Sequence, residues 1–148
     1  MIKLAYRAGL VLAGLTLAAS PAAAKEHHVK MLNKSAQGLM VFEPAFIKIA
    51  PGDTVKFLAT NKGHNAESVG GMAPAGGTMF KGKINEEIVV RFSKPGLYGY
   101  KCLPHVGMGM VGLVQVGGAG NKAQAAAAAQ TLPGLGKKRM VEMLAKAR

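Results

Sequence analysis

Residues 96–116 read GLYGYKCLPHVGMGMVGLVQV and contain the chain's single cysteine between two stretches of strand-forming residues. We expect these stretches to pair as strands on either side of a loop that begins at Cys102. A thiol, an imidazole and a thioether follow one another closely here, from Cys102, His105 and Met110. Because soft sulfur ligands beside imidazole suit copper, the stretch predicts a metal site on the connection between two strands.

A second histidine that could complete such a site lies upstream, in the stretch NKGHN of residues 61–65. Two histidines and one cysteine with a weak axial methionine are typical of blue-copper electron-transfer sites. His64 precedes Cys102 by 38 residues, so it has to reach the site from a neighbouring loop. The predicted metal ligands are therefore His64, Cys102, His105 and Met110.

Two methionines, Met108 and Met110, compete for the axial position. Met110 adjoins the expected return strand, whose pairing would anchor it. Met108 lies between two glycines in the middle of the loop, and we expect it to face solvent. Packing is the alternative for either side chain, because methionine commonly fills gaps in cores. His27 and His28 are interpreted as ordinary polar surface.

Short apolar runs broken by turn residues extend through the chain upstream of the loop. Pro51–Asp53 is typical of a turn, and alternation places Ile88, Val90 and Phe92 on one face of a strand. The expected strands lie at residues 41–42, 46–49, 54–58, 87–92, 97–101 and 112–116. Six to eight short strands at this spacing predict an all-β, antiparallel sandwich.

The composition changes after Gly117–Gly120 to alanine and lysine. Asn121 is expected to cap a short helix through Ala125–Ala129, and a second helix is expected over Lys137–Arg148. Its apolar face would consist of Met140, Val141, Leu144 and Ala147. A basic amphipathic helix can indicate a membrane surface. This apolar face is narrow and lacks a large aromatic residue, so we expect the helix to pack on the sandwich.

The amino-terminal residues 1–24 have the pattern of a secretory signal peptide. Lys3 and Arg7 precede an apolar run over Ala8–Ala19, which is short for a membrane span of about 20 residues. Ser20–Ala24 then supplies the small residues of a cleavage site. We expect export to the periplasm and removal of the leader, which leaves one domain of residues 25–148. An uncleaved membrane anchor is the alternative.

Charge and cysteine content restrict the possible functions. The chain carries +12, and +10 remains without Lys3 and Arg7, a balance that favours acidic partners. Export, the absence of tryptophan and the lack of a basic-aromatic stripe argue against nucleic acid. A free thiol in an oxidising compartment needs an explanation, and a metal provides one. A nucleophilic cysteine–histidine pair would leave Met110 unexplained, so we do not expect an enzyme.

The Cys-x-x-His-x-x-x-x-Met loop with an upstream Gly-His-Asn resembles the cupredoxin family and, within it, the pseudoazurin group. The resemblance covers Glu26 to Arg148. Four further stretches carry it, namely Met31–Asn33, Val41–Pro44, Lys62–Asn65 and Lys101–His105. The resemblance implies a Greek-key β-sandwich with a C-terminal helical extension. It also implies one type 1 blue copper ion per chain, bound by His64, Cys102, His105 and Met110.

The resemblance further implies a one-electron shuttle between Cu(I) and Cu(II). Its acceptor would be a periplasmic reductase such as copper nitrite reductase, with c-type cytochromes as further partners. A ring of lysines near the site is expected to orient an acidic partner: Lys34, Lys62, Lys81, Lys83 and Lys101. We expect a monomer without stable membrane association.

A periplasmic copper-handling or storage protein is the alternative function. Nine methionines and four histidines could serve that purpose. Transport proteins, however, tend to use repeated methionine or paired cysteine motifs, and this chain has one cysteine. The spacing therefore favours electron transfer.

Overall fold

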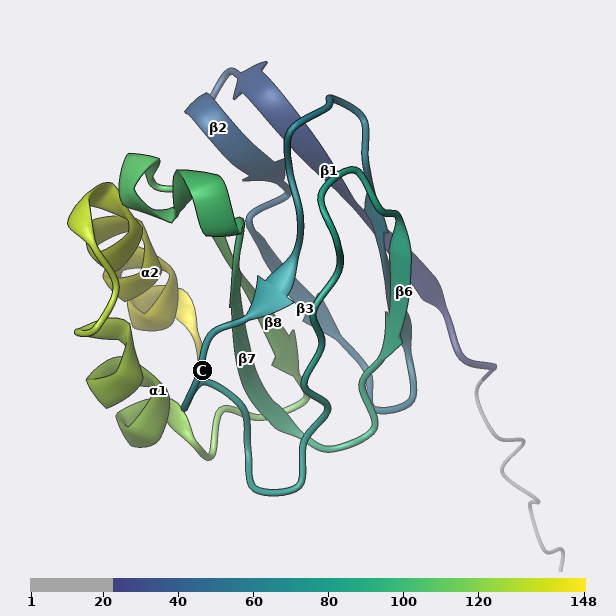
Figure 1. Ribbon diagram of the computed structural model, residues 1–148. Helices are drawn as coiled ribbons and strands as arrows, with labels where there is room; N and C mark the ends of the chain where they lie inside the picture. The colour runs from purple at the N-terminus through teal and green to yellow at the C-terminus, as the bar shows by residue number, and fades with distance from the viewer. Residues whose placement is uncertain (1–22) are drawn as a thin grey trace, which may run out of the picture.

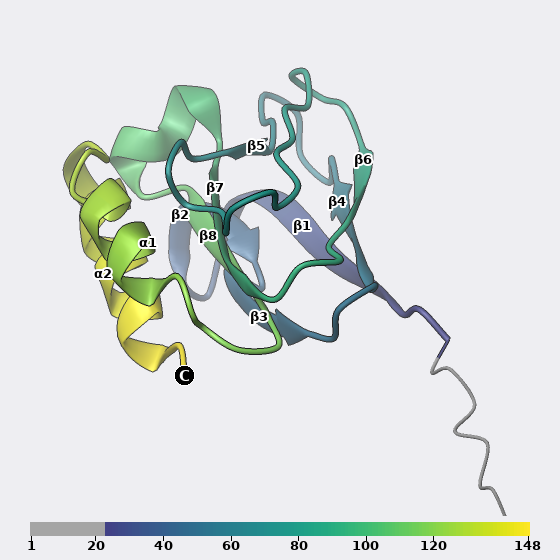
Figure 2. The same cartoon turned by 90° about the horizontal axis from the view of Figure 1, so that it is seen from below.

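The computed structural model describes residues 23–148, so most of the predicted leader lies outside the described residues. Two four-stranded sheets pack face to face, and two helices near the C-terminus cover the outer side of one sheet (Figure 1). The view from below shows the same three layers, with the helices beside β7 and β8 (Figure 2). The all-β sandwich with a helical extension is confirmed.

The first sheet has the strand order β2-β1-β4-β6, and the second has the order β3-β8-β7-β5. The strands are β1 Glu26–Ser35, β2 Gly38–Glu43, β3 Phe46–Ile49, β4 Thr54–Leu58, β5 Glu67–Ser68, β6 Ile88–Arg91, β7 Gly96–Lys101 and β8 Val111–Val116. The expectation of a wholly antiparallel sandwich is wrong for two pairs, because β1 pairs with β4 and β3 with β8 in parallel. The chain crosses between the sheets after β2 and after β3, which brings strands of the same direction together.

Aromatic side chains fill the space between the sheets. The Tyr100 ring lies edge-on to Phe42 and Phe57, with centroid separations of 4.8 and 5.0 Å. The alternation predicted for β6 is confirmed, since Val90 and Phe92 are buried while Val89 is exposed. Cys102 and Met110 belong to this same core. The metal loop is therefore an extension of the packed interior.

The helices α1 (Lys122–Ala129) and α2 (Gly134–Lys146) lie close to the expected positions. Asn121 occupies the cap position of α1, but its side chain makes no capping bond. Its Oδ1 accepts the Leu97 N–H at 2.7 Å and its Nδ2 donates to the Leu97 carbonyl at 3.0 Å. The Asn121 side chain thus satisfies the Leu97 N–H and carbonyl groups on the side of β7 that faces no other strand at this residue. The predicted capping bond is wrong.

Packing of α2 against the sandwich is confirmed, with one change of face. Met140, Leu144 and Ala147 are buried as expected, but Val141 is exposed and Met143 is buried in its place. The helix begins at Gly134, three residues earlier than expected. The side of α2 that packs against β8 and η1 carries Met143, and Val141 therefore faces solvent. Within residues 23–148, neither helix is long and apolar enough to cross a membrane.

Asp53, in the predicted turn, fastens the start of β1 to the sandwich. Its Oδ1 accepts the Lys25 backbone N–H at 2.9 Å, and its Oδ2 accepts the Ala50 N–H at 3.1 Å and lies 2.8 Å from His27 Nε2. These contacts, first the bond from Lys25 and then that from His27, lower the pKa of the Asp53 carboxyl to about 2. His27 is therefore a structural partner of this carboxylate.

We predict that Asp53→Asn lowers the free energy of unfolding at neutral pH. A carboxyl whose pKa falls from 3.8 to about 2 on folding stabilises the fold above pH 3.8, and this contribution is lost as the pH falls toward 2. Urea unfolding of the metal-free protein at pH 7, 4 and 2 measures the effect. The difference between wild type and variant should shrink across this window, and a constant difference would contradict the assignment.

Candidate metal centre

The loop between β7 and β8 is closed by hydrogen bonds between its own ends. Cys102 directly follows β7, and its N–H donates to the Met110 carbonyl at 3.0 Å. The Met110 N–H donates to the His105 carbonyl at 3.2 Å. Residues 103–108 form a short 3-10 helix, η1, which shortens the connection. The loop expected after Cys102 is therefore helical, and it holds Cys102, His105 and Met110 at one end of the sheet.

His64 reaches this end from the loop between β4 and β5. Gly63 has a φ of 93°, which favours glycine, and its N–H donates to Asn85 Oδ1 at 2.7 Å. The His64 carbonyl accepts the Asn85 N–H at 2.8 Å. Asn85 thus holds the loop on both sides of the histidine, and His64 is 1% exposed.

Three of the four predicted ligands converge on one point. His64 Nδ1 lies 3.1 Å from His105 Nδ1, and Cys102 Sγ lies 3.7 and 3.4 Å from these two nitrogens. A tetrahedral ion bonded at about 2.1 Å to nitrogen and about 2.3 Å to sulfur leaves its donors roughly 3.5 Å apart. The spacing of the three donor atoms therefore fits a transition-metal ion.

Met110 is fully buried beside this triangle, and Met108 is 44% exposed. The predicted exposure of Met108 is thus confirmed, and Met110 is the methionine on the inner side of the loop. A thioether is a soft donor that suits copper, whereas zinc sites use nitrogen, oxygen and thiolate. The residues present fit copper better than zinc.

Burial disfavours the charged forms of His64 and Cys102. It lowers the pKa of His64, and the nearby His105 acts in the same direction. Burial also raises the pKa of the Cys102 thiol, against the opposing effect of the Asn65 and His105 backbone N–H groups. A bound cation reverses this balance for the thiol by stabilising the thiolate.

Asn33 orients His64. Sequence reasoning missed this role, and the only available signal was the place of Asn33 in the Met31–Asn33 stretch. His64 Nε2 donates to Asn33 Oδ1 at 2.7 Å, which leaves the Nδ1 lone pair facing Cys102 and His105. The Asn33 N–H in turn donates to Asn61 Oδ1 at 2.8 Å. The ring is thus fixed from the outside by β1.

Asn65, which directly follows His64, joins the two loops of the site. Its Oδ1 accepts the Leu103 N–H at 2.8 Å, and its Nδ2 donates to the Gly82 carbonyl at 3.1 Å and to Glu67 Oε2 at 3.0 Å. Both Asn65 and Glu67 are buried. Cross-linking of this kind fixes His64 relative to Cys102.

Comparisons with known proteins agree with this geometry. The family profile described as copper binding proteins, plastocyanin/azurin family, matches residues 29–117. The pseudoazurin of Paracoccus pantotrophus is 49% identical over 133 residues, covering 90% of this chain and 91% of that protein. The pseudoazurin of Methylorubrum extorquens is 48% identical over 128 residues, covering 84% and 86%. A solved Sinorhizobium pseudoazurin superposes with a TM-score of 0.79 at 49% identity, covering 82% of this chain and 95% of that one.

We predict that Asn65→Ala lowers the unfolding free energy of the metal-free protein by about 1–3 kcal/mol, because three polar groups lose a buried partner. Urea unfolding measures the loss. The matched control is Asn61→Ala, which removes two exposed side-chain bonds, one from the Asn33 N–H and one to the Thr60 carbonyl, and should have a smaller effect. Equal losses in the two variants would contradict a special role for Asn65.

Proposed function

Because this chain belongs to the plastocyanin/azurin family of copper-binding proteins and, within it, to the pseudoazurins, we propose that His64, Cys102, His105 and Met110 hold one copper ion. The protein is a blue copper electron-transfer protein, as its relatives imply. The observation that carries the ligand assignment is the close triangle of His64 Nδ1, His105 Nδ1 and Cys102 Sγ, in which His64 and Cys102 are buried. Bound copper supplies a Cu(I)/Cu(II) couple, whose potential depends on the axial ligand and on hydrogen bonds around the sulfur.

The chain's own residues hold the donors in place around the ion. Cys102 is tied to the end of β7, His64 is fixed by Asn33, and Asn65 fastens the two loops together. Rigid donors need to move little when the charge of the site changes, which favours rapid electron exchange. The surrounding core also excludes water from the thiolate.

His105 is the one half-exposed member of the triangle and provides the route to the surface. An apolar collar, which we define as Leu39, Leu103 and Met108, lies on η1 and on the adjacent β2. These side chains are 55, 51 and 44% exposed. A small apolar patch over a half-exposed ligand suits a brief encounter in which electrons pass and the partners separate.

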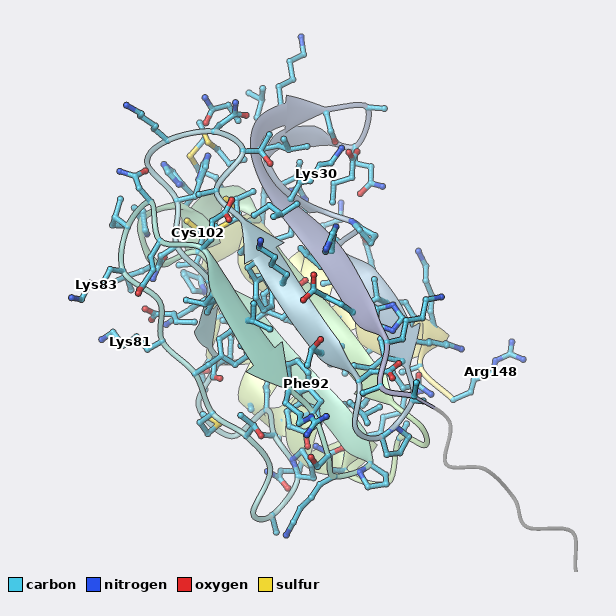
Figure 3. The ribbon with its side chains drawn as sticks, turned by 90° about the vertical axis from the view of Figure 1, so that its right-hand side faces the viewer. Lys30, Lys81, Lys83, Phe92, Cys102 and Arg148 are labelled. Carbon is cyan, nitrogen blue, oxygen red and sulfur yellow. The ribbon has the colours of Figure 1, made fainter. Side chains whose placement is uncertain are left out.

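Basic residues around this end support an acidic redox partner. Lys62, Lys81 and Lys83 are exposed outside the named strands, and Lys34 is exposed near the end of β1. Lys81 and Lys83 extend into solvent on the side where Cys102 lies (Figure 3). Lys101 is different, since its Nζ lies 3.8 Å from the buried Glu67 carboxylate, so we omit it from the ring. The proposed acceptor is a reductase with an acidic docking surface, such as copper nitrite reductase, and c-type cytochromes are further partners.

We also propose that residues 1–24 are a cleaved signal peptide and that residues 25–148 act in the periplasm as one monomeric domain. The apolar run and the small residues of positions 8–24 support this assignment. The role is that of a carrier that transforms no substrate.

Copper storage is a weaker alternative because of where the methionines lie. Met31, Met72, Met140 and Met143 are buried among the core side chains of the sandwich and the helices. They pack as gap-filling residues and are dispersed between two separate clusters. Storage would need many accessible sulfur ligands side by side.

We predict that Cys102→Ser abolishes the intense visible band of the copper-loaded protein, because that band arises from charge transfer between thiolate and copper. Met108→Ala is the matched control and should retain the band, since Met108 faces solvent. Visible absorption after copper titration of each variant is the measurement. Retention of the full band in Cys102→Ser would overturn the assignment.

We predict that electron transfer to an acidic partner slows as ionic strength rises, because the Debye length falls from about 30 Å at 0.01 M to about 8 Å at 0.15 M. At low salt, Lys62→Glu with Lys83→Glu should reduce the second-order rate by about tenfold or more. Lys146→Glu makes the same kind of charge change near the end of α2 and should have less effect. Stopped-flow rates that do not depend on salt would contradict steering.

A further inference from the structure

Helix α2 lies directly against the carbonyl groups of the metal loop. A Cβ on Gly134 would lie 2.6 Å from the Gly107 carbonyl oxygen, and one on Gly136 would lie 2.5 Å from that of Val106. Only glycine permits so close an approach at these two positions. The first turn of the C-terminal helix is therefore shaped to fit η1.

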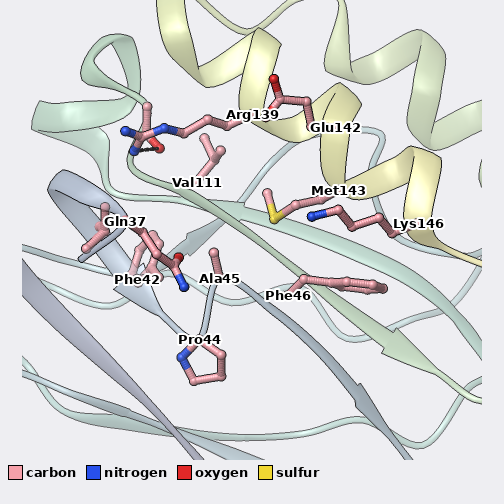
Figure 4. A pocket seen from close by; sticks show the side chains of 12 residues that line it. Gln37, Phe42, Pro44, Ala45, Phe46, Val111, Arg139, Glu142, Met143 and Lys146 are labelled. Carbon is pink, nitrogen blue, oxygen red and sulfur yellow. Dashed lines mark hydrogen bonds between the residues drawn. The ribbon is translucent and has the colours of Figure 1, made fainter. Parts of the chain in front are cut away.

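One turn further along α2, Arg139 makes the polar contact of this interface. Its Nη1 donates to the Gly109 carbonyl at 3.0 Å (Figure 4). The guanidinium also packs beneath Gly109, where a Cβ would lie 2.8 Å from Arg139 Cζ. The guanidinium also lies close to the start of β2, where a Cβ on Gly38 would lie 3.0 Å from Arg139 Nη2. Arg139 thus joins three segments of the chain.

Gly109 is a sensitive point of the loop. It has a left-handed φ of 96° and immediately precedes Met110. The Gly109 carbonyl and the Met110 N–H belong to the same peptide unit. The Met110 N–H donates to the His105 carbonyl. A hydrogen bond that fixes this peptide plane therefore fixes the direction in which the Met110 backbone leaves η1.

We infer that Arg139 is a positioning residue for the metal loop, acting from α2 through the Gly109 carbonyl to hold Met110 in place. The inference rests on the proposed function in so far as Met110 is the axial ligand. The C-terminal extension then contributes to the copper site itself. A charged donor on a carbonyl is among the stronger hydrogen bonds, and the planar guanidinium suits this fixed geometry.

The test compares Arg139→Met with Lys138→Met in the metal-free and copper-loaded forms of the full domain. Arg139→Met keeps an apolar stem and removes the donors, while Lys138 is an exposed neighbour on the same helix and controls for the loss of charge. In the metal-free protein, hydrogen exchange of the Met110 amide should quicken at least about tenfold in Arg139→Met relative to Lys138→Met. The Phe57 amide in β4 should be unchanged, which separates local loosening from general destabilisation.

In the copper-loaded protein, the relative intensities of the thiolate-to-copper bands should change in Arg139→Met and remain as in the wild type in Lys138→Met. Arg139→Lys, which keeps the charge without the planar fork, is the second variant if Arg139→Met does not fold, and its Met110 amide should exchange faster than in Lys138→Met. Exchange and spectra indistinguishable from Lys138→Met would overturn the inference. Failure of the proposed function would instead appear as loss of copper binding by the wild type, with the exchange result unaffected.

Discussion

The hydrogen bond from the Cys102 N–H to the Met110 carbonyl, which continues the pairing of β7 with β8, is the constraint on which the rest of the site depends. It places Cys102 opposite Met110, eight positions further along the chain, and the residues between them form the compact η1. Because both strands are buried in the second sheet, the loop cannot move without disturbing the core. The sulfur donors are therefore positioned by the same packing that stabilises the sandwich.

His64 has no such local partner and is held by side chains from elsewhere. Asn33 comes from the first sheet and Asn65 reaches across to the loop after β7, so the two sheets meet at the donor atoms. Burial favours neutral imidazole in His64, the form that binds a metal. The three donors are thus already close together, with His64 and Cys102 shielded from solvent, and such an arrangement needs little rearrangement when the charge of a bound ion changes.

Surface charge and docking are separable from this internal framework. The exposed lysines of the ring point to solvent and contribute little to folding, while the partly exposed Lys101 pairs with Glu67, which is buried together with Asn65. In the encounter that we propose, charge at the rim would set how often partners meet, whereas the half-exposed His105 and the apolar collar would set what happens after they meet. The C-terminal helices also support the metal loop itself. Helix α2 packs on η1 from the side away from the β4–β5 loop.

The sequence by itself determined the composition of the site and most of the strands. The eight-residue spacing from Cys102 to Met110 and the alternation in β6 are local patterns, and local patterns survive folding because strand period and turn chemistry act over a few residues. Tertiary structure alone decided the parallel pairing of β1 with β4, the orientation of His64 by Asn33, and the use of Asn121 and Arg139 to hold backbone groups of other segments. These contacts join residues about 24 to 31 positions apart, and an asparagine or arginine has the same local pattern whether it faces solvent or a distant carbonyl. Their roles depend on which unpaired backbone and ring groups the packed sheets and helices bring within reach, because buried polar groups require partners.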